Sequence, residues 1–136
     1  LQLNVMRGTD FNSLHQPDPA QASRFRSMEI VGTREVDVVR IDDVASSIVR
    51  AGDTVLLKSD TQGHDLEVLN GAERLWPQIA GVLVEASVVP LYRDQPVIED
   101  TISFMRDRGF LLAGAFPISR PDIVVEFDCL FVRDPR

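Results

Sequence analysis

Asp60, His64 and Glu85 are the side chains of this sequence whose types and positions best suit chemistry at one shared site. Asp60 follows a short apolar run, and His64 comes four residues later, after a turn around Gly63. Glu85 closes the next apolar run along the chain. A carboxylate is costly to bury without a partner, and an imidazole changes its charge near neutral pH. We therefore expect these groups to hold charge or to exchange protons with a ligand.

Each of these three residues also has a structural interpretation, which the sequence leaves open. Asp60 can cap the helix that follows it, since aspartate is a preferred N-cap residue. His64 can be a surface histidine beside a turn. Glu85 can form a salt bridge, for example with Lys58 or Arg93.

Four more residues near these positions are candidates for substrate binding. Lys58 points to the same side as Asp60 if the strand is regular, and it can bind substrate or form an ion pair. Gln62 and Gly63 shape the turn, where glycine allows a positive φ or a close backbone approach. Tyr92 can face a substrate pocket or simply pack. We expect no metal site, because no ligand spacing here is diagnostic of one.

Residues 55–71 predict a strand, a tight turn and a helix that would position these groups. The run Val55-Leu56-Leu57 suits a buried strand, and apolar residues then recur at helical spacing from Leu66. Asp65 stands in the first turn of that helix, where a carboxylate is favourable. In open α/β sheets, ligands bind where such strands end.

The rest of the chain predicts an α/β fold with a mostly parallel sheet, because strands and helices alternate. Only residues 117–122 separate the last two strands, which is too short for a parallel crossover, so these two must be antiparallel if they are neighbours. The expected strands are 1–6 (short), 29–41, 55–59, 79–86, 110–116 and 123–132, and the expected helices are 42–51, 65–71 and 96–109.

Composition limits the classes of function that this chain can have. A length of 136 residues suits one domain, and a net charge of −7 argues against nucleic acid as a partner. A single cysteine, Cys129, fits a reducing compartment. We see no signal peptide and no membrane span, and we expect a cytoplasmic protein without a membrane partner. The chain begins with Leu1 rather than methionine, so we expect a piece of a longer protein.

The central motif resembles that of the FkbM family of methyltransferases. Residues 58–72 read KSDTQGHDLEVLNGA, which is similar to the family pattern K-I-D-[VT]-[EQ]-G-x-E-L-E-V-L-x-G-A. Supporting segments occur in the family's order, and they are Asn12-Ser13-Leu14, Val39 to Val44, Val82 to Glu85, Gly109-Phe110 and Asp128 to Val132. Ser59 replaces a usual apolar residue, and Asp65 stands where glutamate is commoner.

The resemblance implies a Rossmann-like sheet and the transfer of a methyl group from S-adenosylmethionine to a hydroxyl of a small molecule or glycan. It also implies a catalytic role, first for Asp60 and then for Glu85 and His64. The family's Gly-rich donor turn has no counterpart in the sequence, so residues 1–136 resemble a partial domain without its N-terminal, donor-binding half. We therefore expect strand 55–59 to have an open edge that favours self-association. The alternative function is a non-catalytic interaction or assembly module.

Overall fold

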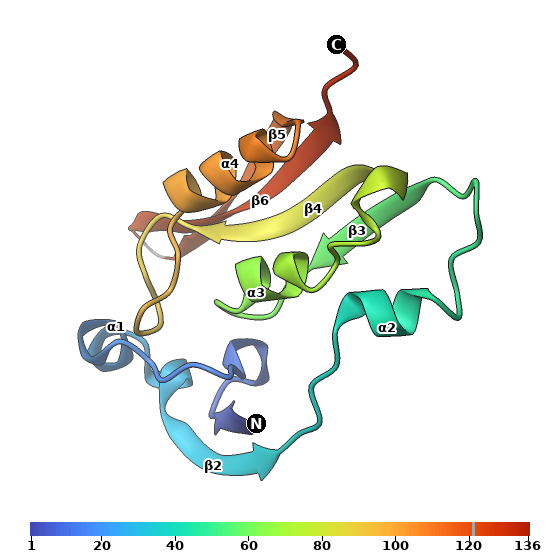
Figure 1. The fold of residues 1–136 in the computed structure, drawn as a ribbon. Helices are drawn as coiled ribbons and strands as arrows, with labels where there is room; N and C mark the ends of the chain where they lie inside the picture. The colour runs from blue at the N-terminus through green and yellow to red at the C-terminus, as the bar shows by residue number, and fades with distance from the viewer. Residues whose placement is uncertain (121) are drawn as a thin grey trace.

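A four-stranded sheet in the order β3-β4-β6-β5 forms the centre of the molecule (Figure 1). The structure is a computed structural model, and it describes residues 1–120 and 122–136. The four strands are β3 (Val55–Ser59), β4 (Ile79–Ser87), β5 (Phe110–Arg120) and β6 (Ile123–Arg133). β3 and β4 are parallel, whereas β6 is antiparallel to both β4 and β5.

The mixed α/β class is confirmed, but the expectation of a mostly parallel sheet is wrong for this sheet. One strand pair is parallel and two are antiparallel. The physical reason is the place of β6, which returns directly from β5 and inserts between β5 and β4. The antiparallel pairing of the last two strands is confirmed. The short connection includes Pro121, which lies outside the described residues.

Helices α3 (Asp65–Asn70) and α4 (Ile98–Asp107) pack against one face of the sheet (Figure 1). As expected, a glycine follows the end of each helix: Gly71 caps α3, and Gly109 comes two residues after α4 with a φ of +78°, which favours glycine. The core beneath them is formed by Leu69, Ala72, Leu75, Ile79, Val82, Val84, Ala86, Met105, Phe110, Cys129 and Phe131.

Helix α2 (Ile41–Ala45) is shorter than the helix that the sequence predicts over 42–51. The start of α2 is held by Asp42 in an unexpected way. Its carboxylate does not cap α2 but accepts hydrogen bonds from the backbone N–H of Arg74, at 3.0 and 3.1 Å. Asp42 therefore ties α2 to the segment after α3. A short 3-10 helix, Trp76–Gln78, then leads into β4.

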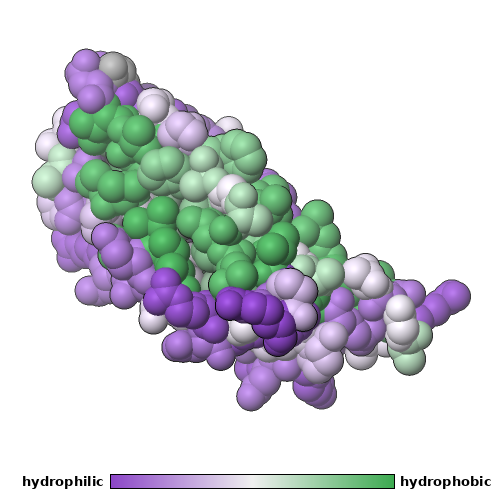
Figure 2. Space-filling view, turned by 90° about the horizontal axis from the view of Figure 1, so that it is seen from above, coloured by the Kyte–Doolittle hydropathy of each residue, from purple (hydrophilic) through white to green (hydrophobic). Residues whose placement is uncertain are grey.

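Within residues 1–120 and 122–136, no helix covers the opposite face of the sheet, which exposes apolar side chains. On this face Leu83 of β4 pairs with Leu130 of β6, and Leu56 of β3 is 67% exposed. Phe116 of β5 is 58% exposed. Figure 2 shows a broad apolar area with a polar border on this side of the molecule. An apolar area of this kind is typical of a surface that contacts something else.

A separate N-terminal unit lies below the sheet (Figure 1). It contains the antiparallel pair β1 (Gln2–Met6) and β2 (Ile30–Glu35), helix α1 (Pro19–Arg24) and two 3-10 helices, Thr9–Phe11 and Arg26–Met28. The strand expected over 29–41 is therefore shorter and lies outside the main sheet. All six residues of β2, with the sequence Ile-Val-Gly-Thr-Arg-Glu, are exposed, and neither set of alternate side chains is apolar throughout, so the strand offers no apolar face to the main sheet.

The N-terminal unit contacts the rest of the molecule through the segment after β4. Met6, Phe11 and Met28 form a second small core with Leu91 and Tyr92. Backbone hydrogen bonds join the same segments, from the N–H of Asp18 to the oxygen of Leu91 and from the N–H of Arg93 to the oxygen of Gln16. This docking brings the N-terminal unit beside the carboxyl ends of β3 and β4.

Candidate functional site

The turn between β3 and α3 is fixed by a buried carboxylate, Asp65. Its Oδ1 accepts a hydrogen bond from the Ser59 hydroxyl at 2.6 Å and another from the Thr61 N–H at 3.1 Å. The side chain that the sequence places in the first helical turn therefore folds back to hold the end of β3. This explains why a serine can stand at position 59, where the family usually has an apolar residue.

Gln62 and Gly63 both have left-handed backbone conformations, with φ values of +52° and +94°. The expectation that Gly63 allows a positive φ and a close approach is confirmed. A Cβ added there would lie 3.1 Å from Cδ2 of Tyr92, so a larger residue would be strained and crowded. The backbone carbonyl oxygen of Gln62 accepts a hydrogen bond from the Ser13 hydroxyl at 2.6 Å. The turn is thus held from both the loop after β4 and the N-terminal unit.

The side chain of Gln62 joins the acidic ends of the two parallel strands. Its Nε2 donates to Oε2 of Glu85 at 2.8 Å and to Oδ1 of Asp60 at 3.3 Å. Its Oε1 accepts a hydrogen bond from the Tyr92 hydroxyl at 3.0 Å. The structure therefore brings Asp60 and Glu85 to one mouth of the sheet, with Gln62 as the bridge between them.

Asp60, Gln62 and Glu85 line a cleft of about 350 Å³ between the sheet and the N-terminal unit. The remaining lining residues are Thr9, Asp10, Asn12, Arg120 and Glu126. Four of the eight lining side chains are carboxylic acids and one is a guanidinium. The cleft therefore suits a ligand that carries hydroxyls or positive charge.

Burial gives two of the cleft carboxyls unusual proton affinity. Desolvation, followed by the negative charges of Glu126 and Asp60, raises the pKa of Glu85 to about 8. Desolvation also raises the pKa of Glu126, while a hydrogen bond from Ser87 and the charge of Arg120 oppose this rise. Carboxyls with raised pKa values that meet in a cleft are typical of functional sites.

Glu126 is the cleft residue that sequence reasoning missed. It is only 2% exposed, and its Oε1 accepts a hydrogen bond from the Ser87 hydroxyl at 3.1 Å. The sequence feature that could have indicated Glu126 is its position as a carboxylate inside the apolar strand predicted over 123–132. Arg120 and Asp10 were also missed, because their approach to the cleft depends on how the N-terminal unit and β5 pack.

Lys58 and Tyr92, two of the expected substrate contacts, lie outside the set of lining residues. Lys58 forms an exposed ion pair with Asp60 at 3.1 Å, which raises the pKa of Lys58. Tyr92 is 1% exposed and supports Gln62 from below, and its hydroxyl also donates to the oxygen of Phe11 at 2.9 Å. Burial raises the pKa of the Tyr92 hydroxyl well above its usual value. Lys58 and Tyr92 therefore contact side chains that line the cleft, Asp60 and Gln62 respectively, without lining it themselves.

His64 is on the other side of the turn from the cleft. Its ring contacts His15, with 3.2 Å between His64 Nδ1 and His15 Nε2, and it is absent from the cleft lining. Among the described contacts of Glu85, the hydrogen bond from Gln62 takes the place of the salt bridge that Lys58 or Arg93 could have supplied. The structure therefore groups Asp60 with Glu85 and separates both from His64.

Comparison with known proteins identifies the family. Residues 3–112 match the Methyltransferase FkbM domain, which covers most of the 136-residue chain. No curated protein and no solved structure gives a significant match. None of the helices in the described part of the chain has the length and apolar character needed to span a bilayer. The matched range includes β3, β4 and the turn that places Asp60, Gln62 and Glu85, and the chain therefore belongs to the FkbM methyltransferase family.

Proposed function

We propose that this chain forms the acceptor side of a methyltransferase that uses S-adenosylmethionine and methylates a hydroxyl on a small molecule or glycan. Family membership supports methyl transfer. The observation that carries the proposal is the bridge from Gln62 to both Asp60 and Glu85 in an open cleft. Carboxylates at the ends of adjacent parallel strands can orient a hydroxyl for in-line attack.

Glu85 is the candidate general base of this cleft. With a pKa of about 8, a substantial fraction of Glu85 is ionised in mildly alkaline solution, and the ionised form can accept a proton from a bound hydroxyl. Gln62 holds the carboxyl by one oxygen, Oε2, which leaves Oε1 available to the acceptor. Asp60 is exposed and can bind a second hydroxyl, which would fix the orientation of the acceptor.

The described cleft fits one part of the methyl donor and not the rest. Its four carboxyls suit the positive sulfonium of S-adenosylmethionine. Its eight lining residues include no aliphatic or aromatic side chain against which the adenine could pack. We therefore assign acceptor binding and proton transfer to this cleft, and we do not place the adenosine there.

Calorimetry tests the proposal with two forms of the protein. We expect S-adenosylmethionine to bind a form in which any residues that precede Leu1 are restored, and to bind residues 1–136 weakly or not at all. Tight binding of S-adenosylmethionine by residues 1–136 would overturn our view that these residues alone do not form the donor site. An extended form that neither binds the donor nor transfers its methyl group to hydroxyl compounds would overturn the enzymatic proposal.

A second candidate function is a non-catalytic module that assembles with another copy of itself. The observation in its favour is β3, which among the described strands pairs only with β4 and leaves its other edge open. Open edges of apolar strands favour pairing with a second strand. Light scattering on the isolated chain tests this, because self-association is expected and a monomer at all concentrations would contradict it.

A further inference from the structure

Two histidines and a glutamate converge on one point outside the cleft. His15 Nε2 lies 3.2 Å from His64 Nδ1, and Oε2 of Glu67 lies 3.8 Å from the same His64 nitrogen. One potential ligand atom from each of the three residues lies within 4.8 Å of the other two. The two imidazole rings are tilted by 48° to each other and do not stack.

One hydrogen bond between the two imidazoles accounts for only two of these three atoms. The Glu67 oxygen, at 3.8 Å from His64 Nδ1, is too far away for a hydrogen bond and interacts with the rings only through its charge. His64 Nδ1 has both a second imidazole nitrogen and a carboxylate oxygen close to it. A cation placed among the three atoms would interact with all three lone pairs at once.

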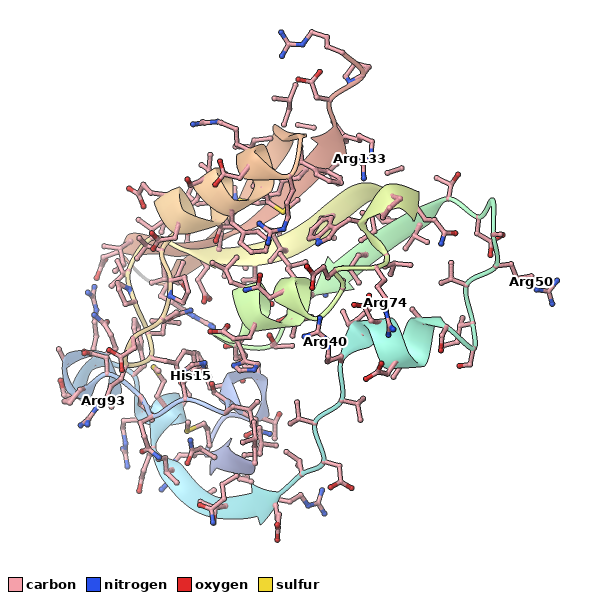
Figure 3. All side chains as sticks on the ribbon, in the orientation of Figure 1. His15, Arg40, Arg50, Arg74, Arg93 and Arg133 are labelled. Carbon is pink, nitrogen blue, oxygen red and sulfur yellow. The ribbon has the colours of Figure 1, made fainter. Side chains whose placement is uncertain are left out.

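The backbone positions the three residues before any ligand arrives. His64 follows the constrained turn at Gln62 and Gly63, and Glu67 stands one helical turn further on in α3. His15 belongs to the N-terminal unit, where its backbone N–H donates to the Ser13 hydroxyl at 3.0 Å. That hydroxyl in turn donates to the Gln62 oxygen at 2.6 Å. His15 is labelled in Figure 3, on the N-terminal segment near α3.

We propose that His15, His64 and Glu67 bind a divalent transition-metal ion, with Zn²⁺ as the best fit. Two imidazole nitrogens on one tetrahedral zinc ion, each at about 2.0–2.1 Å, lie roughly 3.3 Å apart. The separation of 3.2 Å in this structure is close to that value. Glu67 needs only a small movement to bind, and its side chain is 47% exposed and therefore mobile enough to make it.

The chemistry of the ligands selects the class of ion. Neutral imidazole is the commonest protein ligand for zinc and related metals, whereas Mg²⁺ and Ca²⁺ prefer oxygen. A set of two histidines and one glutamate leaves a fourth tetrahedral position for water. The ion would join residues 49 positions apart and so fasten the N-terminal unit to α3. We assign the ion to this fastening rather than to the methyl-transfer cleft, because none of its three ligands lines the cleft.

A zinc titration of the purified chain, in competition with a chromophoric chelator, tests this site. We expect one zinc ion per chain and a rise in the thermal unfolding temperature, because a ligand that binds only the folded state stabilises it. His15→Gln and Glu67→Gln should each weaken binding at least tenfold and reduce the rise in unfolding temperature. Cobalt substituted for zinc should give a visible spectrum typical of a tetrahedral site.

Two matched controls make the result decisive. Glu99→Gln removes an exposed carboxylate from α4, far from the cluster in the sequence, and should leave the zinc affinity unchanged. Glu85→Gln should also leave it unchanged, whereas a loss in this variant would place the metal in the cleft and overturn the proposal. Equal affinity of the wild type and Glu67→Gln, or no binding by the wild type, would overturn it as well. Glu67 is exposed, so this variant is expected to fold.

Discussion

The two sides of the turn at residues 60–64 differ in chemistry although they share one short piece of backbone. On one side, Asp60 and the side chain of Gln62 meet Glu85 in an acidic cleft. On the other side, His64 meets His15 of the N-terminal unit. The left-handed conformations of Gln62 and Gly63 lie between the two groups.

This difference teaches that neighbours in a motif need not act together. Asp60 and His64 are four residues apart in one motif, yet the turn directs them to different surfaces. Glu85 comes from another strand and still reaches Asp60 through Gln62. Substitutions that affect one side and spare the other can test how independent the two sides are.

The largest difference should appear in methyl transfer. In a form of the protein that transfers methyl groups, Glu85→Gln should lower kcat by about 10²–10⁴-fold, because a general base contributes that much. His64→Gln should change kcat by less than tenfold, because His64 is outside the cleft. Steady-state kinetics with a hydroxyl acceptor measure both. Equal losses in the two variants would mean that the two sides work as one site.

A substitution in the shared turn should disturb both sides at once. Gly63→Ala places a Cβ in a left-handed conformation and 3.1 Å from Tyr92, so we expect it to lower the free energy of unfolding by about 2–3 kcal/mol. Gly109→Ala is the matched control, since it has a φ of +78° but no atom within 4 Å of its added Cβ. Urea denaturation should show a smaller loss for Gly109→Ala. A larger loss there would argue against crowding at Tyr92.

The cleft side should also have its own dependence on pH. The folded protein holds the Glu85 proton more tightly than the unfolded chain, because its pKa rises from 4.5 to about 8 on folding. Its stabilising contribution is therefore complete below about pH 4.5 and is lost as the pH rises to about 8. We expect a fall on the order of 1–3 kcal/mol after allowing for partial exposure. Urea denaturation across this range should show a weaker dependence for Glu85→Gln.

A smaller effect should separate the N-terminal unit from the turn. Ser13→Ala removes the 2.6 Å hydrogen bond to the Gln62 oxygen, which costs about 0.5–1.5 kcal/mol. Hydrogen exchange of the β1 and β2 amides should become faster, while the amides of β4 and β6 keep their protection. Uniformly faster exchange in all four strands would mean that the two units unfold together.

The smallest effect should be at the rim of the cleft. The ion pair between Lys58 and Asp60 is exposed to solvent, with side chains that are 57% and 44% accessible, and water and salt weaken the attraction there. Lys58→Met should leave the urea midpoint unchanged within error. A clear shift of the midpoint would show that the rim stabilises the fold more than its exposure implies.

The sequence predicted those parts of the molecule in which local patterns agree with the tertiary structure. β3, α3, β4 and α4 follow from apolar periodicity and from the glycines at 71 and 109, and the approach of Asp60 to Glu85 follows from parallel pairing. The position of β2 could not be predicted, because its alternation suits a strand without showing which sheet contains it. Glu126 and His15 were missed, since only the docking of distant segments brings them to their partners.

The order of the strands in the sheet has a consequence for synthesis of the chain. β4 and β5 are made before β6, yet β6 lies between them and bonds to both. Until the ribosome has released residues 123–133, therefore, the growing chain cannot close its main sheet. During that interval the apolar edges of β4 and β5 remain open to chaperones and to neighbouring nascent chains.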